Sequence, residues 1–346
     1  SFDGEGWLKI ARKGILGASF PSEYGGSGRD PLTAVLMLEA LGYGCRDNGL
    51  TYAVNSQIWS VQDPILRFGT DEQRSAWLPS LLRGEVVGAF AMTEPSSGSD
   101  TFSMKTTATK TSDGYILNGH KTFITLGPIC DVAVIFASTN PDHGQWGISA
   151  FLVDGTSRGM HRPGSTGKMG LRTAPIGDII LADCWVPETS LLGPEGAGAS
   201  IFSDTLVWER GLIMASQVGA MERQLEDTIS YVRSREQFGR PVGQFQSVSN
   251  RIVDMKLRLD VSRQLLYRMA WHKSTGRADA VDAALTKLFV SEAFVESSLD
   301  SIRNHGGVGY LTDFEVERDL RDAVGGLIYS GTSDIQKQVA ARLLGL

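Results

Sequence analysis

The chain has 346 residues, of which 42% are hydrophobic and 21% are charged, a composition typical of globular proteins. Its formal net charge of −6 argues against nucleic acid or an anionic membrane surface as the main partner. No apolar run approaches the roughly 18 residues of a membrane span, and the start lacks the charged leader and apolar block of a signal peptide.

The cysteines and histidines form no metal-binding pattern. Cys45, Cys130 and Cys184 lie far apart without a CxxC pair, and the five histidines form neither an HxxxH nor an HExxH pair. We therefore expect reduced thiols, a cytoplasmic location and no metal site.

Residues 1–84 are predicted to be mostly helical. A helix is expected over residues 32–41, because Pro31 suits a first helical turn, and a glycine turn is expected after it at residues 42–44. A further helix is predicted to begin at Asp71, since acidic residues are favoured in a first turn.

Residues 85–192 are predicted to form a small antiparallel β-domain, either a barrel or a sandwich. Short apolar runs alternate there with Gly, Asn, Asp and Pro, which is typical of strands joined by tight turns. The clearest runs are residues 115–117, 132–136, 148–153 and 179–181.

Residues 193–346 are predicted to form a helical bundle, which makes the whole chain an α+β protein. Long amphipathic stretches with short links are typical of an up-and-down bundle. The stretches are residues 206–233, 248–274 and 278–303, followed by a last helix from Thr332.

Glu209 is the strongest candidate for acid–base chemistry. A carboxylate on an otherwise apolar helix face is partly desolvated, which suits a general base working near neutrality. The alternative is an inward carboxylate paired with an arginine, for which Arg210 is the nearest candidate. The residues three and four positions away, which share its predicted helix face, are Thr205, Leu206, Leu212 and Ile213.

Two polar turns could meet a ligand. Residues 93–100 (TEPSSGSD) gather hydroxyl and N–H donors that suit an anion or a polar ring, although a plain turn is the alternative. Residues 235–241 place an arginine beside an aromatic, which suits a phosphate, or form an exposed helix end. His305 is expected to be packed rather than catalytic.

Ser330 stands where a negative charge would be stabilised. Gly331 interrupts the chain and Thr332 can cap a following helix, whose free N–H groups favour a carboxylate or a bound anion. A serine at this place indicates either an inactive site or an acid located elsewhere.

Taken together, these motifs resemble those of the acyl-CoA dehydrogenase flavoprotein family, and the resemblance covers essentially the whole chain. The family has a further N-terminal helix before Phe2, so the start of the chain looks truncated. The matching segments are residues 24–26, 92–100, 118–125, 168–172, 235–239, 305–307 and 331–332.

The resemblance implies an N-terminal helical domain over residues 1–84, a middle β-domain over residues 85–192 and a C-terminal four-helix bundle over residues 193–346. It places FAD between the last two domains. It also implies a homotetramer or a homodimer in which a neighbouring subunit reaches the cofactor.

The resemblance also assigns residues to FAD. A threonine hydroxyl can bond flavin N5, the atom that takes the hydride, and the start of the last helix can help to hold the diphosphate. The flavin ring and phosphates are assigned to Met92, Thr93, Ser99, Phe123 and Thr125, the adenine end to Arg235, Phe238 and Gln246 of an adjacent subunit, and a further contact to Thr332 and Asp334.

The reaction implied is the α,β-dehydrogenation of an acyl thioester, in which a base removes the α-proton and the β-hydrogen leaves as hydride to flavin N5. Many members carry the base at the position of Ser330, but the isovaleryl-CoA and long-chain branches carry it on a helix, in a setting that Glu209 matches. Glu209 is therefore predicted to be the base, and the Ser330 N–H is predicted to donate to the thioester carbonyl. Tyr329 and Arg210 are assigned to the substrate pocket.

Several possibilities for the substrate and the activity stay open. Acyl-CoA is the first candidate substrate, and an aminoacyl group such as proline, held on a carrier protein of secondary metabolism, is the alternative. A flavin monooxygenase or oxidase and a non-catalytic flavin-binding protein are further alternatives on the same scaffold. The electron acceptor is expected to be an electron-transfer flavoprotein or oxygen.

Overall fold

The computed structural model describes residues 1–277 and 279–346 of the chain. These residues form two compact units, and two of the boundaries between them, at Tyr52 and at Glu209, fall inside the helices α3 (Asn48–Ser56) and α6 (Gly198–Leu212). Unit 1 comprises Ser1–Arg29, Ala53–Lys168 and Arg172–Glu209, and unit 2 comprises Asp30–Tyr52, Met169–Leu171 and Arg210–Leu346.

Short helices form the first part of unit 1. The helix predicted from Asp71 is confirmed as α5 (Asp71–Leu82), and a capping box explains why it begins there. The Gln73 N–H donates to Thr70 Oγ1 at 3.2 Å, and the Thr70 N–H donates to Gln73 Oε1 at 3.1 Å. Unit 1 also contains α1 (Gly4–Arg12), a π-helical segment (Gln57–Gln62) and α4 (Asp63–Phe68).

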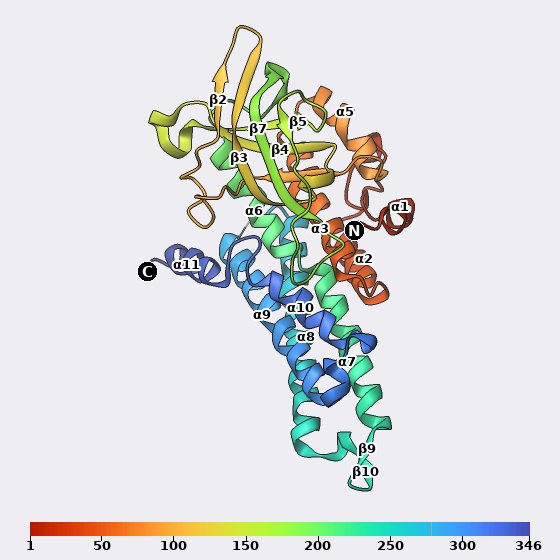
Figure 1. The fold of residues 1–346 in the computed structure, drawn as a ribbon. Helices are drawn as coiled ribbons and strands as arrows, with labels where there is room; N and C mark the ends of the chain where they lie inside the picture. The colour runs from red at the N-terminus through yellow and green to blue at the C-terminus, as the bar shows by residue number, and fades with distance from the viewer. Residues whose placement is uncertain (278) are drawn as a thin grey trace. The chain divides into compact units, whose positions relative to one another are not determined.

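A mixed sheet forms the body of unit 1 (Figure 1). Its strands lie in the order β6-β7-β3-β2-β4-β5-β8, and β1 pairs with β4 beside that path. Buried side chains such as Tyr115, Ile135 and Phe151 pack into one core. The strands are β1 (Gly88–Ala91), β2 (Thr107–Lys110), β3 (Gly114–Thr125), β4 (Val132–Ser138), β5 (Ile148–Asp154), β6 (Met160–His161), β7 (Ile176–Pro187) and β8 (Leu191–Leu192).

The predicted β-domain is confirmed, but the expectation of a wholly antiparallel sheet is wrong. Strand β4 pairs in parallel with β1, where Gly88 faces Val132, and also with β2, where Thr107 faces Ser138. Parallel pairing depends on the long connections between these strands and not on the alternation within each strand, so the sequence pattern did not indicate it.

Strand β3 carries an irregularity that exposes one aromatic ring. Its pairing with β7 shifts register between Lys121 and Ile124, and Phe123 takes a left-handed φ of 56° there. A bulge of this kind re-aims side chains. The Phe123 side chain is therefore 66% exposed, although its neighbours Thr122 and Ile124 are buried.

Long helices form unit 2, which confirms the predicted helical bundle. Helices α7, α8 and α9 lie side by side, and α2 packs against α7 and α8 (Figure 1). The stretch predicted over residues 278–303 begins at Ala278, which lies outside the described residues. Unit 2 contains α2 (Pro31–Gly44), α7 (Ala215–Ser234), β9 (Glu236–Gln237), β10 (Arg240–Pro241), α8 (Gln246–Ser274), α9 (Ala280–His305), α10 (Val316–Gly326) and α11 (Ser333–Leu343).

The glycine turn predicted at residues 42–44 is wrong, because α2 continues to Gly44. Gly42 lies instead where α2 meets α7, and a Cβ there would stand 1.8 Å from the carbonyl oxygen of Ser216. Gly219 of α7 lies equally close to the backbone of α2, since a Cβ there would stand 1.9 Å from the Glu39 carbonyl oxygen. These glycines allow two helices to approach closely and do not mark a turn.

The single helical stretch predicted over residues 206–233 is interrupted, because α6 ends at Leu212 and α7 begins at Ala215. Ile213 and Met214 between them are fully buried, and no side chain caps the start of α7. The break therefore has no capping signal that the sequence could have shown.

One segment of the predicted motifs, residues 168–172, is bound in part to α10 of unit 2. The Leu171 N–H donates to Asp322 Oδ1 at 2.5 Å, and Arg321 Nη1 donates to the Met169 carbonyl at 3.0 Å. Gly170 is needed between them, because a Cβ would lie 2.1 Å from the Arg321 carbonyl oxygen.

Two features are absent from the described residues. Over residues 1–277 and 279–346, no helix combines the length and the apolar character that crossing a bilayer requires. The same part of the chain brings together no group of three or more His, Cys, Asp or Glu side chains that could hold a metal ion.

Candidate active site and cofactor contacts

Glu209 lies in the last turn of α6, and its side chain is only 5% exposed. The burial that the sequence predicted for this carboxylate is therefore confirmed, while its role stays a prediction. A carboxylate shielded from water is a stronger base than an exposed one. The residues of α6 that share its helix face, Thr205, Leu206 and Leu212, are buried as well, and so is Ile213, which lies just beyond the end of the helix.

The donor-rich turn at residues 93–100 is fixed to strand β3 by a buried ion pair. Lys121 of β3 contacts Glu94 with 2.9 Å between Nζ and Oε1. The same Nζ donates to the Met92 carbonyl at 3.1 Å. The pair thus fastens the segment that follows β1 to the strand that carries Phe123.

These bonds bring predicted flavin contacts onto adjacent segments of unit 1. The Thr122 N–H donates to the Thr93 carbonyl at 2.9 Å, so Thr93 lies directly beside β3. Thr93 and Thr125 are half-buried, Phe123 and Ser99 are exposed, and Met92 is buried. Of the five predicted residues, Met92 therefore presents the least side-chain surface.

The turn that contains Ser330 is a strained piece of backbone between α10 and α11. Ser330 has a φ of 58° and Gly331 a φ of 90°, and the left-handed region costs a residue with a Cβ about 1–2 kcal/mol. Arg210 Nε donates to the Ser330 carbonyl at 3.1 Å. Arg210, which was predicted for the substrate pocket, is therefore bonded to this turn.

Two residues that hold the same turn were missed in the sequence. Lys287 Nζ and Gln336 Nε2 donate to the Gly331 carbonyl at 2.7 and 2.9 Å, and both side chains are fully buried. The criterion that selected Glu209 would also have selected Lys287, because its helix face is equally apolar. The buried residues three and four positions away are Ala283, Ala284, Val290 and Ser291.

Tyr329 lies in a cluster of polar and aromatic side chains within unit 2. Its hydroxyl accepts from Gln217 Nε2 and donates to Met214 Sδ at 3.5 Å. Its ring centroid lies 4.5 Å from that of Tyr52. Gln217 was also missed, because a glutamine within a helix carries no distinguishing pattern.

The predicted start of the last helix is confirmed. Thr332 caps α11, since its Oγ1 accepts from the Ile335 N–H at 3.2 Å. Asp334 lies exposed in the first turn of the helix, where a negative charge interacts favourably with the helix dipole. Both predicted residues are therefore at a helix N-terminus.

The predicted adenine contacts surround the hairpin of β9 and β10. Arg235 directly follows the last residue of α7, and Gln246 begins α8. Phe238 and Gly239 form the hairpin tip with φ values of 52° and 74°, as a tight hairpin turn requires. The Phe238 side chain is 93% exposed, so nearly all of its apolar surface is open to contact with another molecule.

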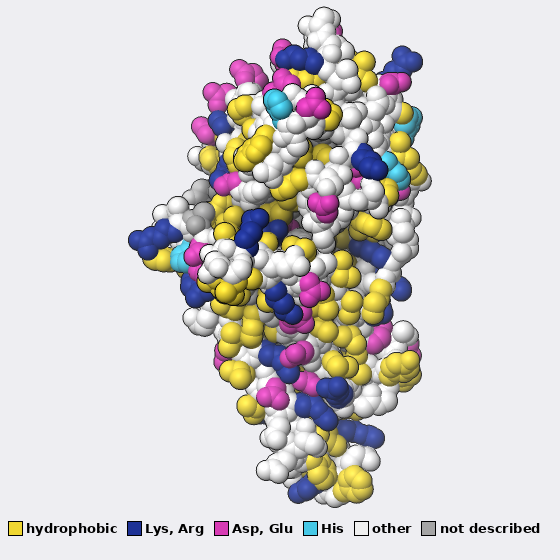
Figure 2. All heavy atoms as spheres, turned by 90° about the vertical axis from the view of Figure 1, so that its left-hand side faces the viewer, with side chains coloured by type: hydrophobic (Ala, Val, Ile, Leu, Met, Phe, Trp, Pro, Cys, Tyr) yellow, Lys and Arg dark blue, Asp and Glu magenta, His cyan; other side chains and the backbone are white. Residues whose placement is uncertain are grey.

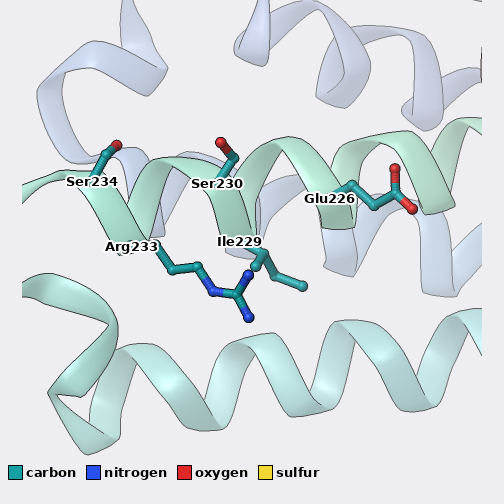
Figure 3. A pocket seen from close by; sticks show the side chains of 5 residues that line it. All are labelled: Glu226, Ile229, Ser230, Arg233 and Ser234. Carbon is teal, nitrogen blue, oxygen red and sulfur yellow. The ribbon is translucent and has the colours of Figure 1, made fainter.

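A groove of about 530 Å³ lies along α7 in unit 2. In Figure 3, Ile229 and Arg233 project from one side of the helix, and Ser230 and Ser234 project from the other. With Glu226 they line the groove, and no predicted site residue is among them. The groove is therefore distinct from the predicted catalytic residues.

Three domain models of one family match this chain in order. The N-terminal domain of acyl-CoA dehydrogenases matches residues 1–85, the middle domain matches residues 89–184 and the C-terminal domain matches residues 196–345. The boundaries predicted after residues 84 and 192 stay predictions.

Individual relatives match over nearly the full chain. An L-prolyl-[peptidyl-carrier protein] dehydrogenase of Serratia sp. is 43% identical over 340 residues, which cover 98% of this chain and 88% of the relative. The solved prolyl acyl carrier protein oxidase AnaB is 45% identical with a TM-score of 0.98, covering 100% of this chain and 91% of its own. The structure of PigA with FAD and proline is 43% identical with a TM-score of 0.97, covering 100% of this chain and 90% of its own. The chain therefore belongs to the acyl-CoA dehydrogenase family, which confirms the predicted family, fold and FAD cofactor and makes it an FAD-dependent oxidoreductase acting on CH–CH bonds.

Proposed function

We propose that this protein uses FAD to dehydrogenate an acyl group held as a thioester on a carrier protein, and that this acyl group is prolyl. The support is that the Serratia relative and AnaB are named for prolyl groups on carriers, and that PigA was solved with FAD and proline. Acyl-CoA, which the sequence placed first, becomes the second candidate, because it is the substrate for which the family is named.

FAD suits the groups that unit 1 presents. Phe123 keeps an exposed ring on a bulge of β3, the strand that also carries Thr125 and that is hydrogen-bonded to Thr93. An aromatic ring and hydroxyls on adjacent segments suit a flat ring with polar edges. Met92 and Ser99 are the other two predicted flavin contacts of unit 1. When bound, FAD supplies the acceptor for the hydride that leaves the acyl β-carbon.

Unit 2 presents groups for other parts of FAD. The N–H groups at the start of α11 suit a phosphate, whereas the Asp334 carboxylate only accepts hydrogen bonds and so suits a sugar or ribityl hydroxyl. Arg235 can pair with a phosphate and Phe238 can stack on adenine, with Gln246 as a further polar contact. The exposure of Phe238 fits a cofactor held by a neighbouring subunit.

The burial of Glu209 carries the proposed chemistry. Its carboxylate is enclosed on a helix, in a chain whose tail has Ser330 where many family members have their base. A serine hydroxyl is too weak a base for an α-proton at neutral pH, whereas a desolvated carboxylate can accept one. Glu209 takes the α-proton, and a double bond forms between the α- and β-carbons as the hydride leaves.

The Ser330 N–H activates the thioester in this proposal. It donates to the thioester oxygen, where negative charge develops as the α-proton leaves. A serine keeps the backbone N–H that a glutamate would have there, so the substitution does not remove this contact. Tyr329 forms part of the wall of the substrate pocket. Arg210 helps to hold the turn through its bond to the Ser330 carbonyl.

Anaerobic bleaching of bound FAD tests the substrate and the base together. Prolyl-loaded carrier, prolyl-CoA and a series of acyl-CoA thioesters are mixed with the protein, and prolyl-loaded carrier should bleach it fastest. Glu209→Gln should retain FAD but slow bleaching by about 10²–10⁴-fold. Ser330→Ala and the exposed control Glu23→Gln should change the rate little.

The same experiment separates the alternatives. Bleaching by acyl-CoA alone supports the second candidate substrate. A Glu209→Gln variant that bleaches at the rate of the wild type shows that another group is the base. A wild-type protein that no thioester bleaches shows that the substrate is not among the thioesters of this series.

The electron acceptor that reoxidises the reduced FAD is also part of the proposal. Oxygen is the first acceptor to test, because AnaB is named an oxidase, and an electron-transfer flavoprotein is the second. Reoxidation rates in air and with that flavoprotein distinguish them.

A homotetramer or homodimer is proposed because apolar side chains of α8 such as Val253 and Leu257 are exposed. Figure 2 shows hydrophobic side chains lying open among charged ones on the face that it draws. Sedimentation velocity measures the assembly, and a monomer at micromolar concentration would contradict this part of the proposal.

A further inference from the structure

Lys287 is a fully buried lysine on an otherwise apolar face of α9. Taking an ammonium group out of water is unfavourable, and an apolar side chain of similar length would pack there without that penalty. Its Nζ donates to the Gly331 carbonyl at 2.7 Å. Its position is therefore better explained by what it does to this turn than by packing.

The turn is held by donors from three helices. The Ser330 carbonyl accepts from Arg210 Nε at 3.1 Å and from Gln336 Nε2 at 3.0 Å. The Gly331 carbonyl accepts from Lys287 Nζ and from Gln336 Nε2 at 2.9 Å. Two successive carbonyls thus accept two side-chain bonds each, which is far more than a connecting turn needs.

These bonds determine where the backbone N–H groups of the turn point. A trans peptide is planar, and its N–H is directed opposite to its C=O. Holding the carbonyls of Ser330 and Gly331 therefore fixes the two peptide planes that follow these residues, which carry the N–H groups of Gly331 and Thr332. The Ser330 N–H belongs to the preceding peptide and is joined to the first of these planes through the Ser330 Cα. Once that plane is held, only the rotations of Ser330 itself can redirect this N–H, and its left-handed φ of 58° is unfavourable for a serine.

We propose that Lys287 and Gln336 are positioning residues, which hold the Ser330 N–H on the thioester carbonyl. The inference rests on the proposed function, because it assumes an acyl thioester at this turn. Donors that stabilise developing charge act only while they are preorganised, and a displacement of about 1 Å can cost about 100-fold in rate. The loss of either side chain should thus affect the reaction more than the binding of substrate.

A carbonyl-stretch measurement tests this role directly. The FAD-loaded protein is mixed with carrier protein bearing 2-methylproline, with ¹³C in the thioester carbonyl. The methyl group leaves no α-proton to remove, so the complex does not react. In the wild type the bound stretch should fall below its value in water, and in Lys287→Met it should return toward that value.

Kinetics with prolyl-loaded carrier supply the second readout. Lys287→Met should bleach FAD about 10- to 100-fold more slowly, with an unchanged KM. Gln336→Met should behave similarly, and it replaces Lys287→Met if that variant does not fold. Lys337→Met, which changes an exposed lysine one residue after Gln336, is the matched control and should match the wild type in both readouts.

The outcomes distinguish this inference from the proposed function. If Lys287→Met and Gln336→Met slow bleaching but leave the stretch at its wild-type position, the residues are only structural and the inference is wrong. The inference is also wrong if neither readout changes. If no thioester bleaches the wild type, the proposed function fails first, and the inference fails with it.

Discussion

Lys121 and Glu94 form an ion pair with 2.9 Å between Nζ and Oε1, and their side chains are 0% and 3% exposed. The Glu94 carboxylate also accepts from the N–H groups of Lys105 and Thr106, at 2.6 and 3.0 Å. The pair joins strand β3 to the segment after β1, which are the two segments that carry the predicted flavin contacts of unit 1. Removing one partner of a buried ion pair is costly, because the other charge stays buried without its counter-ion.

Replacing Lys121 by Met should lower the free energy of unfolding by about 3–5 kcal/mol, because it leaves the Glu94 carboxylate buried without its cation. The double variant Lys121→Met with Glu94→Gln should recover part of this loss. Urea denaturation of the FAD-free protein measures both. The control is Lys256→Met, whose pair with Asp260 is exposed and should contribute less than about 1 kcal/mol. Equal stability of Lys121→Met and the wild type would contradict the prediction.

Gly42→Ala should destabilise the protein although alanine is the better helix former by about 1 kcal/mol. Its Cβ would stand 1.8 Å from the Ser216 carbonyl oxygen, so α2 and α7 would have to separate, at a cost of about 1–3 kcal/mol or more. Gly44 is the control in the same helix, because a Cβ there meets nothing within 4 Å. The midpoint of thermal unfolding should therefore be lower for Gly42→Ala than for the wild type, whereas Gly44→Ala should not lower it. Equal midpoints would show that the helices can adjust without cost.

Signals that act over a few residues made much of the fold predictable. The acidic residues that predicted α5 lie within its first turn, and the Thr332 cap lies within one turn of α11. The role of Gly42 depends instead on the backbone of Ser216, far along the chain, and the break before α7 depends on packing around Met214. No local pattern carries that information, so these features had to be seen in the structure.

The candidate site was predictable to a similar extent. A charged residue on an apolar helix face indicates a special role, which selects Glu209 and would also select Lys287. The periodicity of α9 does not show that Lys287 reaches the Gly331 carbonyl, because this contact depends on the path of the turn between α10 and α11. Gln217 and Gln336 give no such signal, since glutamine is ordinary on helix surfaces.

His305 should make the stability of the protein depend on pH. As predicted it is packed, with 9% exposure, and its Nδ1–H donates to the Ser301 carbonyl at 2.8 Å. Burial lowers the pKa of His305 below its ordinary value of 6.5, against the opposing effects of the Ser301 bond and of Asp227. The unfolded chain therefore binds a proton near pH 6.5 that the folded protein does not bind.

This difference in bound protons determines whether stability rises or falls with pH. The contribution of His305 to stability is complete above pH 6.5 and is lost as the pH falls toward the folded-state pKa. In His305→Gln, stability should fall less steeply as the pH drops below 6.5. His143→Gln changes an exposed histidine and should leave this dependence unchanged. Urea midpoints between about pH 5 and pH 8 measure the slopes, and parallel slopes for all three proteins would refute the assignment.

Phe123 combines two features that folding alone does not require, a left-handed φ of 56° and a ring that is 66% exposed. The left-handed region costs a residue with a Cβ about 1–2 kcal/mol, and glycine adopts it freely. Glycine also loses more conformational freedom on folding, by about 0.5–1 kcal/mol. Phe123→Gly should therefore leave the stability of the FAD-free protein unchanged or raise it by up to about 1 kcal/mol.

FAD binding should respond to the same substitution in the opposite direction. If the ring contacts the flavin, its loss should weaken FAD binding about 10-fold, as expected for an aromatic contact worth about 1.5 kcal/mol. Leu126→Gly is the control, because Leu126 has a similar φ of 60° but a buried side chain, so it should lose stability. Urea denaturation and titration of flavin fluorescence measure the two quantities. A Phe123→Gly variant that is less stable and binds FAD as tightly as the wild type would overturn both the strain argument and the assignment of this ring to the cofactor.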